Sequence, residues 1–224
     1  MNPAGRADVE GDRVRIAILD YGMGNHRSVE KAVQKVGADA HITADPSEVD
    51  GAAGLIVPGV GAFPEAMRRI HEREYDTLIG ATLAEGRPVM GICLGMQILF
   101  ESSTEHEGAW GLGLLQGRVE ELDAAGLKVP QLGWNEVRWR RSSPLNAQLP
   151  DPGYFYFANS YAARVVDEQD VLGESDYGTP FVAVVERAPL YGAQFHPEKS
   201  STHGLQMLRN FVAICRRAAA IPGQ

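Results

Sequence analysis

Residues 91–95 (Gly-Ile-Cys-Leu-Gly) place a cysteine between two glycines, each two positions away. An apolar run precedes this segment and another follows it, which predicts a strand that turns sharply into a helix. Such a turn lifts a nucleophile above its sheet, and the helix N-terminus favours a thiolate. Cys93 is therefore the candidate nucleophile, with the Leu94 amide free to meet an oxyanion. The alternative is a buried cysteine between packing glycines.

Residues 194–199 (Gln-Phe-His-Pro-Glu-Lys) offer a base for that thiol. A residue before proline favours extended backbone, and extended residues two apart point to the same side. His196 and Glu198 should therefore project together, so that the carboxylate orients the imidazole. A lone histidine at a strand end is usually structural. Combined with the cysteine turn, this segment favours a Cys–His–Glu triad.

Residues 58–61 (Pro-Gly-Val-Gly) follow another apolar strand and should emerge at the same carboxyl edge of the sheet as Cys93. Their uncovered amides could supply a second oxyanion donor, although a plain turn is the simpler interpretation of this segment alone. The other cysteine, Cys215, lies among apolar residues of the last helical segment and is expected to be a core residue.

The elements that must position these groups alternate between strands and helices in the first hundred residues. This order predicts an α/β fold with a single open mixed sheet, mostly parallel, and helices on both faces. Aromatic and alternating runs in residues 117–194 predict an antiparallel extension of the sheet. We expect a flexible extension at 1–12, one domain at 13–219 and a tail at 220–224. The expected strands are 14–19, 54–57 and 87–92, and the expected helices are 29–36, 63–71, 94–100 and 203–219.

Composition excludes several classes of protein. The 224 residues carry a net charge of −8, which argues against a nucleic-acid partner. No apolar run is long enough for a membrane span, and the first fifteen residues lack the apolar core of a signal peptide. Histidine and cysteine spacing fits no metal site. A cytoplasmic globular protein is expected.

The motifs Gly-x-Cys-x-Gly-x-Gln and His-Pro-Glu together resemble those of the triad (class I) glutamine amidotransferases, whose fold is flavodoxin-like. Four further features resemble the glutaminase subunits of imidazole glycerol phosphate synthases within that family. The likeness runs from about residue 14 to 217. The four features are residues 20–25 (Asp-Tyr-Gly-Met-Gly-Asn), 58–61, 133–135 (Gly-Trp-Asn) and 155–161 (Phe-Tyr-Phe-Ala-Asn-Ser-Tyr).

The resemblance implies that Cys93 attacks the side-chain amide carbon of glutamine, His196 transfers protons and Glu198 orients it. Water then hydrolyses the γ-glutamyl thioester. The Leu94 and Val60 amides would form the oxyanion hole, the latter by a rotation of its peptide.

The resemblance also implies which residues bind the substrate, and it implies no metal or cofactor. Gln97 and Glu105 would hold the amino-acid end of glutamine. Backbone groups of Gly61, Ser160 and Tyr161 would complete that pocket.

A partner follows from the resemblance as well. Free ammonia is largely protonated at neutral pH, so a glutaminase that feeds a synthesis must release it into a sheltered passage. The implied partner is a (β/α)₈-barrel cyclase subunit, which would form a heterodimer and produce imidazole glycerol phosphate and an aminoimidazole carboxamide ribonucleotide. The docking face would include residues 58–63, Trp134 and Lys199.

Three alternatives remain at this point. Another triad glutaminase, feeding pyridoxal phosphate, anthranilate or carbamoyl phosphate synthesis, would share the catalytic residues and differ in its partner. A cysteine hydrolase such as a γ-glutamyl peptidase would need no partner. A non-enzymatic binding module would have no use for an intact triad.

Overall fold

Five parallel strands form one half of the sheet in the computed structural model, which describes residues 13–220. Their order is β2-β1-β3-β4-β13, and nearly all their residues are buried. Helices cover both faces, which explains why these strands are almost continuously apolar. The bounds are β1 (Arg15–Leu19), β2 (Asp39–Thr43), β3 (Gly54–Gly59), β4 (Val89–Cys93) and β13 (Leu190–Ala193).

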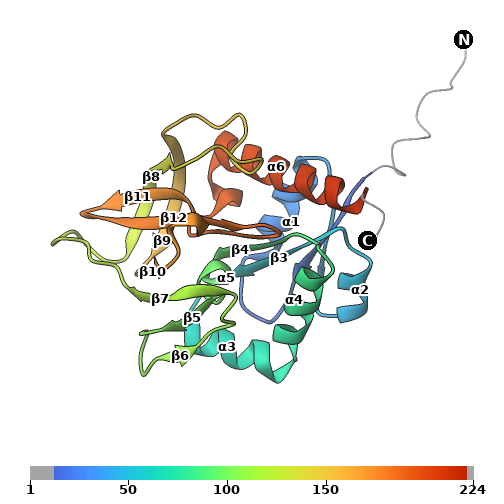
Figure 1. The fold of residues 1–224 in the computed structure, drawn as a ribbon, viewed down its shortest axis with the longest axis horizontal. Helices are drawn as coiled ribbons and strands as arrows, with labels where there is room; N and C mark the ends of the chain where they lie inside the picture. Colours follow the sequence, from blue (N-terminus) through green and yellow to red (C-terminus); the bar gives the residue numbers. More distant parts are fainter. Residues whose placement is uncertain (1–12, 221–224) are drawn as a thin grey trace, which may run out of the picture.

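The helices form two layers around this half of the sheet (Figure 1). Helices α1 (His26–Lys35) and α6 (Ser201–Ala219) pack on one face. Helices α2 (Pro46–Asp50), α3 (Phe63–Glu72) and α4 (Tyr75–Ala84) pack on the other. Each layer has its own apolar core, so the sheet is enclosed as the strand pattern predicts.

The second half of the sheet is built from hairpins, and every pairing beyond β13 is antiparallel except that of β5 with β7. The sheet continues as β12-β10-β7-β5-β6, and β11, β8 and β9 branch from β12. The predicted fold class is confirmed. The bounds are β5 (Phe100–Ser103), β6 (Ala109–Trp110), β7 (Leu115–Glu121), β8 (Gln131–Trp139), β9 (Gly153–Asn159), β10 (Tyr161–Val165), β11 (Val171–Tyr177) and β12 (Thr179–Arg187). Two 3₁₀ turns are η1 (Glu168–Asp170) and η2 (Pro197–Lys199).

The helix predicted over residues 94–100 is wrong in its second half. Helix α5 covers only Leu94–Gln97, and strand β5 already begins at Phe100. The carbonyl of Ile98 accepts from the amide of Leu112, and that of Leu99 accepts from the amides of Leu114 and Leu115. The backbone hydrogen bonds of this apolar run therefore go to a distant segment of the chain, which ends the helix.

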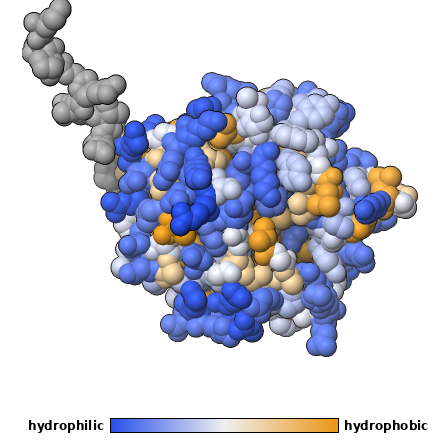
Figure 2. Space-filling model, turned by 180° about the vertical axis from the view of Figure 1, so that it is seen from behind, coloured by the Kyte–Doolittle hydropathy of each residue, from blue (hydrophilic) through white to orange (hydrophobic). Residues whose placement is uncertain are grey.

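The surface seen in Figure 2 is mostly polar, with separate apolar patches. Within residues 13–220, none of the helices is both long and apolar enough to cross a bilayer. The expectations for residues 1–12 and for the tail at 220–224 fall outside the described part of the chain, apart from Ala220.

Candidate active site

Three segments meet at the carboxyl edge of the parallel strands. Strand β3 ends at Gly59, the register partner of Cys93 at the end of β4. On the other side of β4, Ala193 of β13 pairs with Ile92. Residues following β13 therefore emerge beside Cys93, and the loop after Gly59 flanks it opposite. The turn predicted at residue 58 begins only after Gly59, because Pro58 and Gly59 still belong to β3.

The turn at Cys93 is a strained nucleophile elbow. Its φ angle is 55° and its ψ is −113°, a conformation that few non-glycine residues adopt. A Cβ on Gly91 would lie 2.7 Å from the Cα of Met96, and one on Gly95 would lie 2.8 Å from the carbonyl carbon of Val57. Both glycines are therefore required by the close approach of backbone to backbone.

His196 and Glu198 are joined by a hydrogen bond of 2.9 Å between Nδ1 and Oε1. Their side chains are only 4% and 1% exposed. The amide of His196 donates to the carbonyl of Tyr156 and its carbonyl accepts from the Ser200 hydroxyl, so the backbone that carries the imidazole is fixed.

Burial acts to lower the pKa of His196, but the neighbouring Cys93 sulfur and the Glu198 carboxylate together outweigh it. They raise the pKa of the imidazole to about 9. A histidine with this pKa is protonated at neutral pH. The geometry therefore provides an imidazolium that can stabilise a thiolate on one side and that a carboxylate holds on the other.

A cavity of about 330 Å³ opens directly above the thiol. All the predicted site residues line it except Glu198, which lies behind the imidazole. The cavity is closed on its remaining sides by residues of β8 and β9 and by Lys199. Its lining residues are Val60, Gly61, Cys93, Leu94, Gln97, Glu105, Pro130, Leu132, Ala158, Asn159, Ser160, Tyr161, His196 and Lys199.

The predicted oxyanion donors, Leu94 and Val60, line the same cavity as Cys93. Leu94 is the first residue of α5, so its amide has no acceptor within the helix. Val60 follows the end of β3 at the mouth of the cavity, and its side chain is 43% exposed. The elbow therefore places, directly after Cys93, a backbone donor that the helix itself does not use.

The predicted substrate-binding groups already make contacts inside the protein. One carboxylate oxygen of Glu105 accepts from the amide of Phe63, at the start of α3, over 2.7 Å. The carbonyl of Ser160 accepts from the amide of Leu122, and that of Tyr161 accepts from the Gln97 and Asn159 side chains. These bonds fix the cavity wall before any ligand enters.

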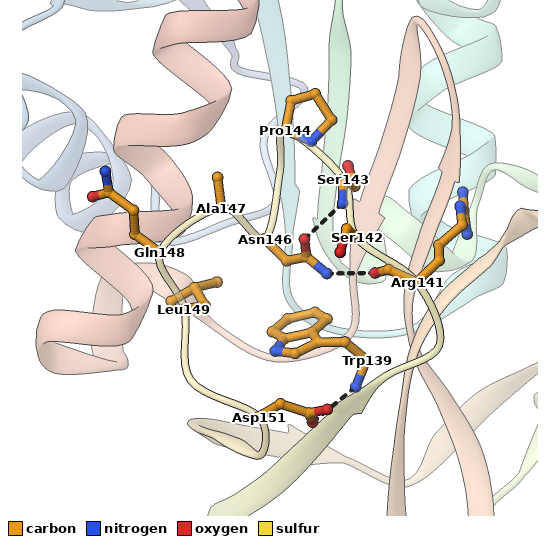
Figure 3. Close-up of a pocket in the computed structure, with 10 residues that line it drawn as sticks. All are labelled: Trp139, Arg141, Ser142, Ser143, Pro144, Asn146, Ala147, Gln148, Leu149 and Asp151. Atoms are coloured by element: carbon orange, nitrogen blue, oxygen red, sulfur yellow. Dashed lines mark hydrogen bonds between the residues drawn. The ribbon is translucent and has the colours of Figure 1, made fainter.

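A larger hollow of about 710 Å³ lies elsewhere, inside the loop that joins β8 to β9 (Figure 3). Three hydrogen bonds join residues of this lining to each other. The Asn146 side chain accepts from the amide of Ser143 and donates to the carbonyl of Arg141, and the amide of Trp139 donates to Asp151. The lining has neither a cysteine nor a histidine, so the smaller cavity is the candidate active site.

Residues 17–215 match the family model described as glutamine amidotransferase class-I. This match covers most of the chain. The chain belongs to the class-I glutamine amidotransferase family.

Two relatives of this amidotransferase carry the name "Imidazole glycerol phosphate synthase subunit HisH". The protein of Bacillus cereus (strain G9842) is 47% identical over 199 residues, which is 89% of this chain and 94% of the relative. The protein of Symbiobacterium thermophilum is 48% identical over 197 residues, which is 88% of this chain and 92% of the relative. A crystal structure titled as a glutamine amidotransferase matches with a TM-score of 0.71 at 20% identity, covering 89% of this chain and 98% of that one. The last match supports the fold alone.

The second cysteine of the amidotransferase lies far from this cavity. Cys215 of α6 is fully buried, and its sulfur packs against Gly54 at the start of β3. Burial raises the pKa of the Cys215 thiol, which opposes ionisation. Both cysteines are free thiols. Across residues 13–220, no group of three histidine, cysteine or acidic side chains could hold a metal ion.

The structure adds one residue that the sequence analysis did not select. Gln194 is fully buried, and its side-chain nitrogen lies 3.8 Å from the sulfur of Cys93. Gln194 directly follows β13, and the register of β13 with β4 places it beside Cys93. The sequence carries no local signal for this contact.

Proposed function

We propose that this chain is the glutaminase subunit of an imidazole glycerol phosphate synthase, an enzyme of histidine biosynthesis. It would hydrolyse glutamine to glutamate and ammonia and pass the ammonia to a cyclase subunit. The observation that carries the proposal is the placement of Cys93 in a strained elbow at the floor of a cavity. The imidazole of His196 lines the same cavity, and the Glu198 carboxylate holds that imidazole.

Catalysis begins when the thiolate of Cys93 attacks the side-chain amide carbon of glutamine. The carbonyl oxygen becomes an oxyanion, which the amides of Leu94 and Val60 stabilise. His196 donates its proton to the departing ammonia, and a γ-glutamyl thioester remains on the sulfur. The now neutral imidazole takes a proton from water, which attacks the thioester carbon. The C–S bond then breaks, which releases glutamate and restores the thiolate–imidazolium pair. Glu198 holds the imidazole in place throughout.

The cavity suits a single amino acid. A volume of about 330 Å³ lies at the small end of ligand pockets in proteins. Glu105 supplies a carboxylate for the α-ammonium group, and Gln97 together with backbone groups of Gly61, Ser160 and Tyr161 supplies neutral partners. This chemistry fits the zwitterionic end of glutamine.

The partner is proposed to be a (β/α)₈-barrel cyclase that docks over the cavity to form a heterodimer. The mouth carries apolar side chains that are unusually exposed, with Val60 43%, Leu132 64% and Trp134 54% exposed. Beside them, the Lys199 ammonium lies over the ring of Tyr156 at 5.8 Å. Exposed apolar groups around a polar cavity are typical of a surface that another protein covers. A cytoplasmic location stays a prediction.

The test is a glutaminase assay with and without the cyclase subunit and its nucleotide ligand. We expect glutamine hydrolysis to rise when both are added, and the Cys93→Ala complex to make product from ammonium but not from glutamine. Stimulation by a different synthase, and none by the cyclase, would indicate another triad glutaminase. Hydrolysis of γ-glutamyl peptides without a partner, with free glutamine unused, would indicate a peptidase.

A further inference from the structure

The register of the sheet places Gln194 beside Cys93. Ala193, the last residue of β13, pairs with Ile92 of β4. The residues that follow this pair, Gln194 and Cys93, therefore lie side by side. The Gln194 side chain is fully buried, and its Nε2 donates to the Cys93 sulfur over 3.8 Å. Two polar side chains, the imidazole of His196 and the amide of Gln194, therefore lie at the sulfur.

Neighbouring groups fix the direction of this amide. The carbonyl of Tyr161 can only accept, so the Gln97 side chain must turn its NH₂ group toward it, at 3.0 Å. The same NH₂ group donates to Oε1 of Gln194, also at 3.0 Å. Because that end of Gln194 must be the acceptor, the nitrogen of Gln194 is the end that faces Cys93.

We propose that Gln194 is a positioning residue for the nucleophile, which holds the Cys93 sulfur with a buried N–H and favours its thiolate form. A chain of hydrogen bonds then runs from the carbonyl of Tyr161, in the substrate cavity, through the buried amides of Gln97 and Gln194 to the Cys93 sulfur. This role deepens the proposed glutaminase function and rests on it. The hydrogen bond itself can be tested without glutamine.

The experiment measures the rate at which iodoacetamide alkylates Cys93 in the intact chain from pH 5 to 10, with the Cys93 peptide quantified by mass spectrometry. Gln194→Met keeps the length and burial of the side chain but removes the donor. We expect the midpoint of its pH profile to move about one pH unit upward, as for a lost hydrogen bond to a charged group. Gln194→Glu, which places an acceptor at the sulfur, should move it further in the same direction.

Within residues 13–220, two titratable groups besides the thiol lie against this sulfur. They are His196 and the buried phenol of Tyr21, whose pKa burial and Cys93 raise. Glu105 and Lys199 line the same cavity, and all four groups remain in every variant. Gln131→Met is the matched control, because Gln131 is a glutamine of β8 that is only 2% exposed. It should keep the wild-type midpoint.

Equal midpoints for Gln194→Met, Gln194→Glu and wild type would overturn the proposal. If Gln194→Met fails to fold, as judged by circular dichroism, Gln97→Leu replaces it. That change leaves the Gln194 amide without its orienting partner and should shift the midpoint upward by a smaller amount, and no shift would contradict the proposal. In the glutaminase assay, Gln194→Met should lower kcat several-fold with little change in KM. A chain that does not hydrolyse glutamine would still show the alkylation shift, so the two proposals can fail separately.

Discussion

Gly91 and Gly95 lie against each other across the turn that carries Cys93. A Cβ added to Gly91 would lie 2.6 Å from the carbonyl carbon of Gly95. A Cβ added to Gly95 would meet the carbonyl group of Val57 on the neighbouring strand. The atoms that an added Cβ would meet belong to the backbone, which cannot move aside easily. The position of Cys93 therefore requires glycine at both 91 and 95.

Alanine at either glycine should therefore destabilise the protein. We expect Gly91→Ala and Gly95→Ala each to lower the free energy of unfolding by about 1–3 kcal/mol, measured by urea denaturation. The control is Gly80→Ala in α4, where an added Cβ meets nothing within 4 Å. That change should raise the free energy of unfolding by roughly 0.5–1 kcal/mol. Equal effects at all three glycines would contradict the close approach.

The raised pKa of His196 predicts the alkaline limit of activity. The imidazolium must give its proton to the departing ammonia, so kcat/KM should fall as the pH rises through about 9. Glu198 contributes to raising the pKa of His196, so Glu198→Gln should move this limit downward, toward the ordinary histidine value. Glu168→Gln, at an exposed carboxylate of η1, is the control and should leave it unchanged. If the alkaline limit of kcat/KM in Glu198→Gln equals that of the wild type, Glu198 does not orient His196.

Removal of the Tyr21 hydroxyl should have an unusual effect on the free energy of unfolding. Tyr21 is fully buried, and its hydroxyl finds no hydrogen-bond partner among residues 13–220. Removing an unsatisfied buried polar group should not cost stability, so Tyr21→Phe should leave the free energy of unfolding unchanged or raise it by up to about 1 kcal/mol. Tyr75→Phe is the matched control, because the Tyr75 hydroxyl donates to the carbonyl of Ala44 over 2.8 Å. Its loss should cost about 1 kcal/mol. Thermal unfolding that ranks the two variants in the opposite order would refute the prediction.

Glu105 combines a structural bond with the proposed contact to the substrate ammonium. Glu105→Gln keeps an oxygen for the amide of Phe63 but removes the charge. We expect KM for glutamine to rise roughly 10- to 100-fold, as for a lost charged hydrogen bond, with the melting temperature nearly unchanged. Glu101→Gln provides the comparison, since Glu101 accepts from the amide of Gly117 and does not line the cavity. A KM that rises equally in both variants would argue against a substrate contact at Glu105.

The sequence was most informative where local spacing decides geometry. Two glycines around Cys93 predict the elbow because the clash lies within one turn of backbone. The spacing of His196 and Glu198 predicts that their side chains meet, and they do. The backbone between them is not extended as expected, because a 3₁₀ turn begins at Pro197 and brings the carboxylate to the imidazole. The alternation of strands and helices likewise predicts a sheet enclosed on both faces.

Contacts between distant segments could not be predicted in this way. Helix α5 ends early because the carbonyls of Ile98 and Leu99 accept hydrogen bonds from amides within residues 112–115. Nothing in the sequence of residues 94–100 predicts that pairing. The amide of Gln194 reaches Cys93 only because β13 lies beside β4, in a register that brings residues a hundred positions apart together. Side-chain networks of this kind depend on tertiary register, which periodicity does not contain.

The most direct test of the account is covalent trapping with a glutamine analogue such as 6-diazo-5-oxo-norleucine, followed by peptide mass spectrometry. One adduct per chain is expected, on Cys93, and excess glutamine should suppress it. Cys215→Ser should label as the wild type does, and His196→Ala should label far more slowly. An adduct on Cys215, or labelling of Cys93 that glutamine does not slow, would contradict the claim that this thiol is the nucleophile of a glutaminase.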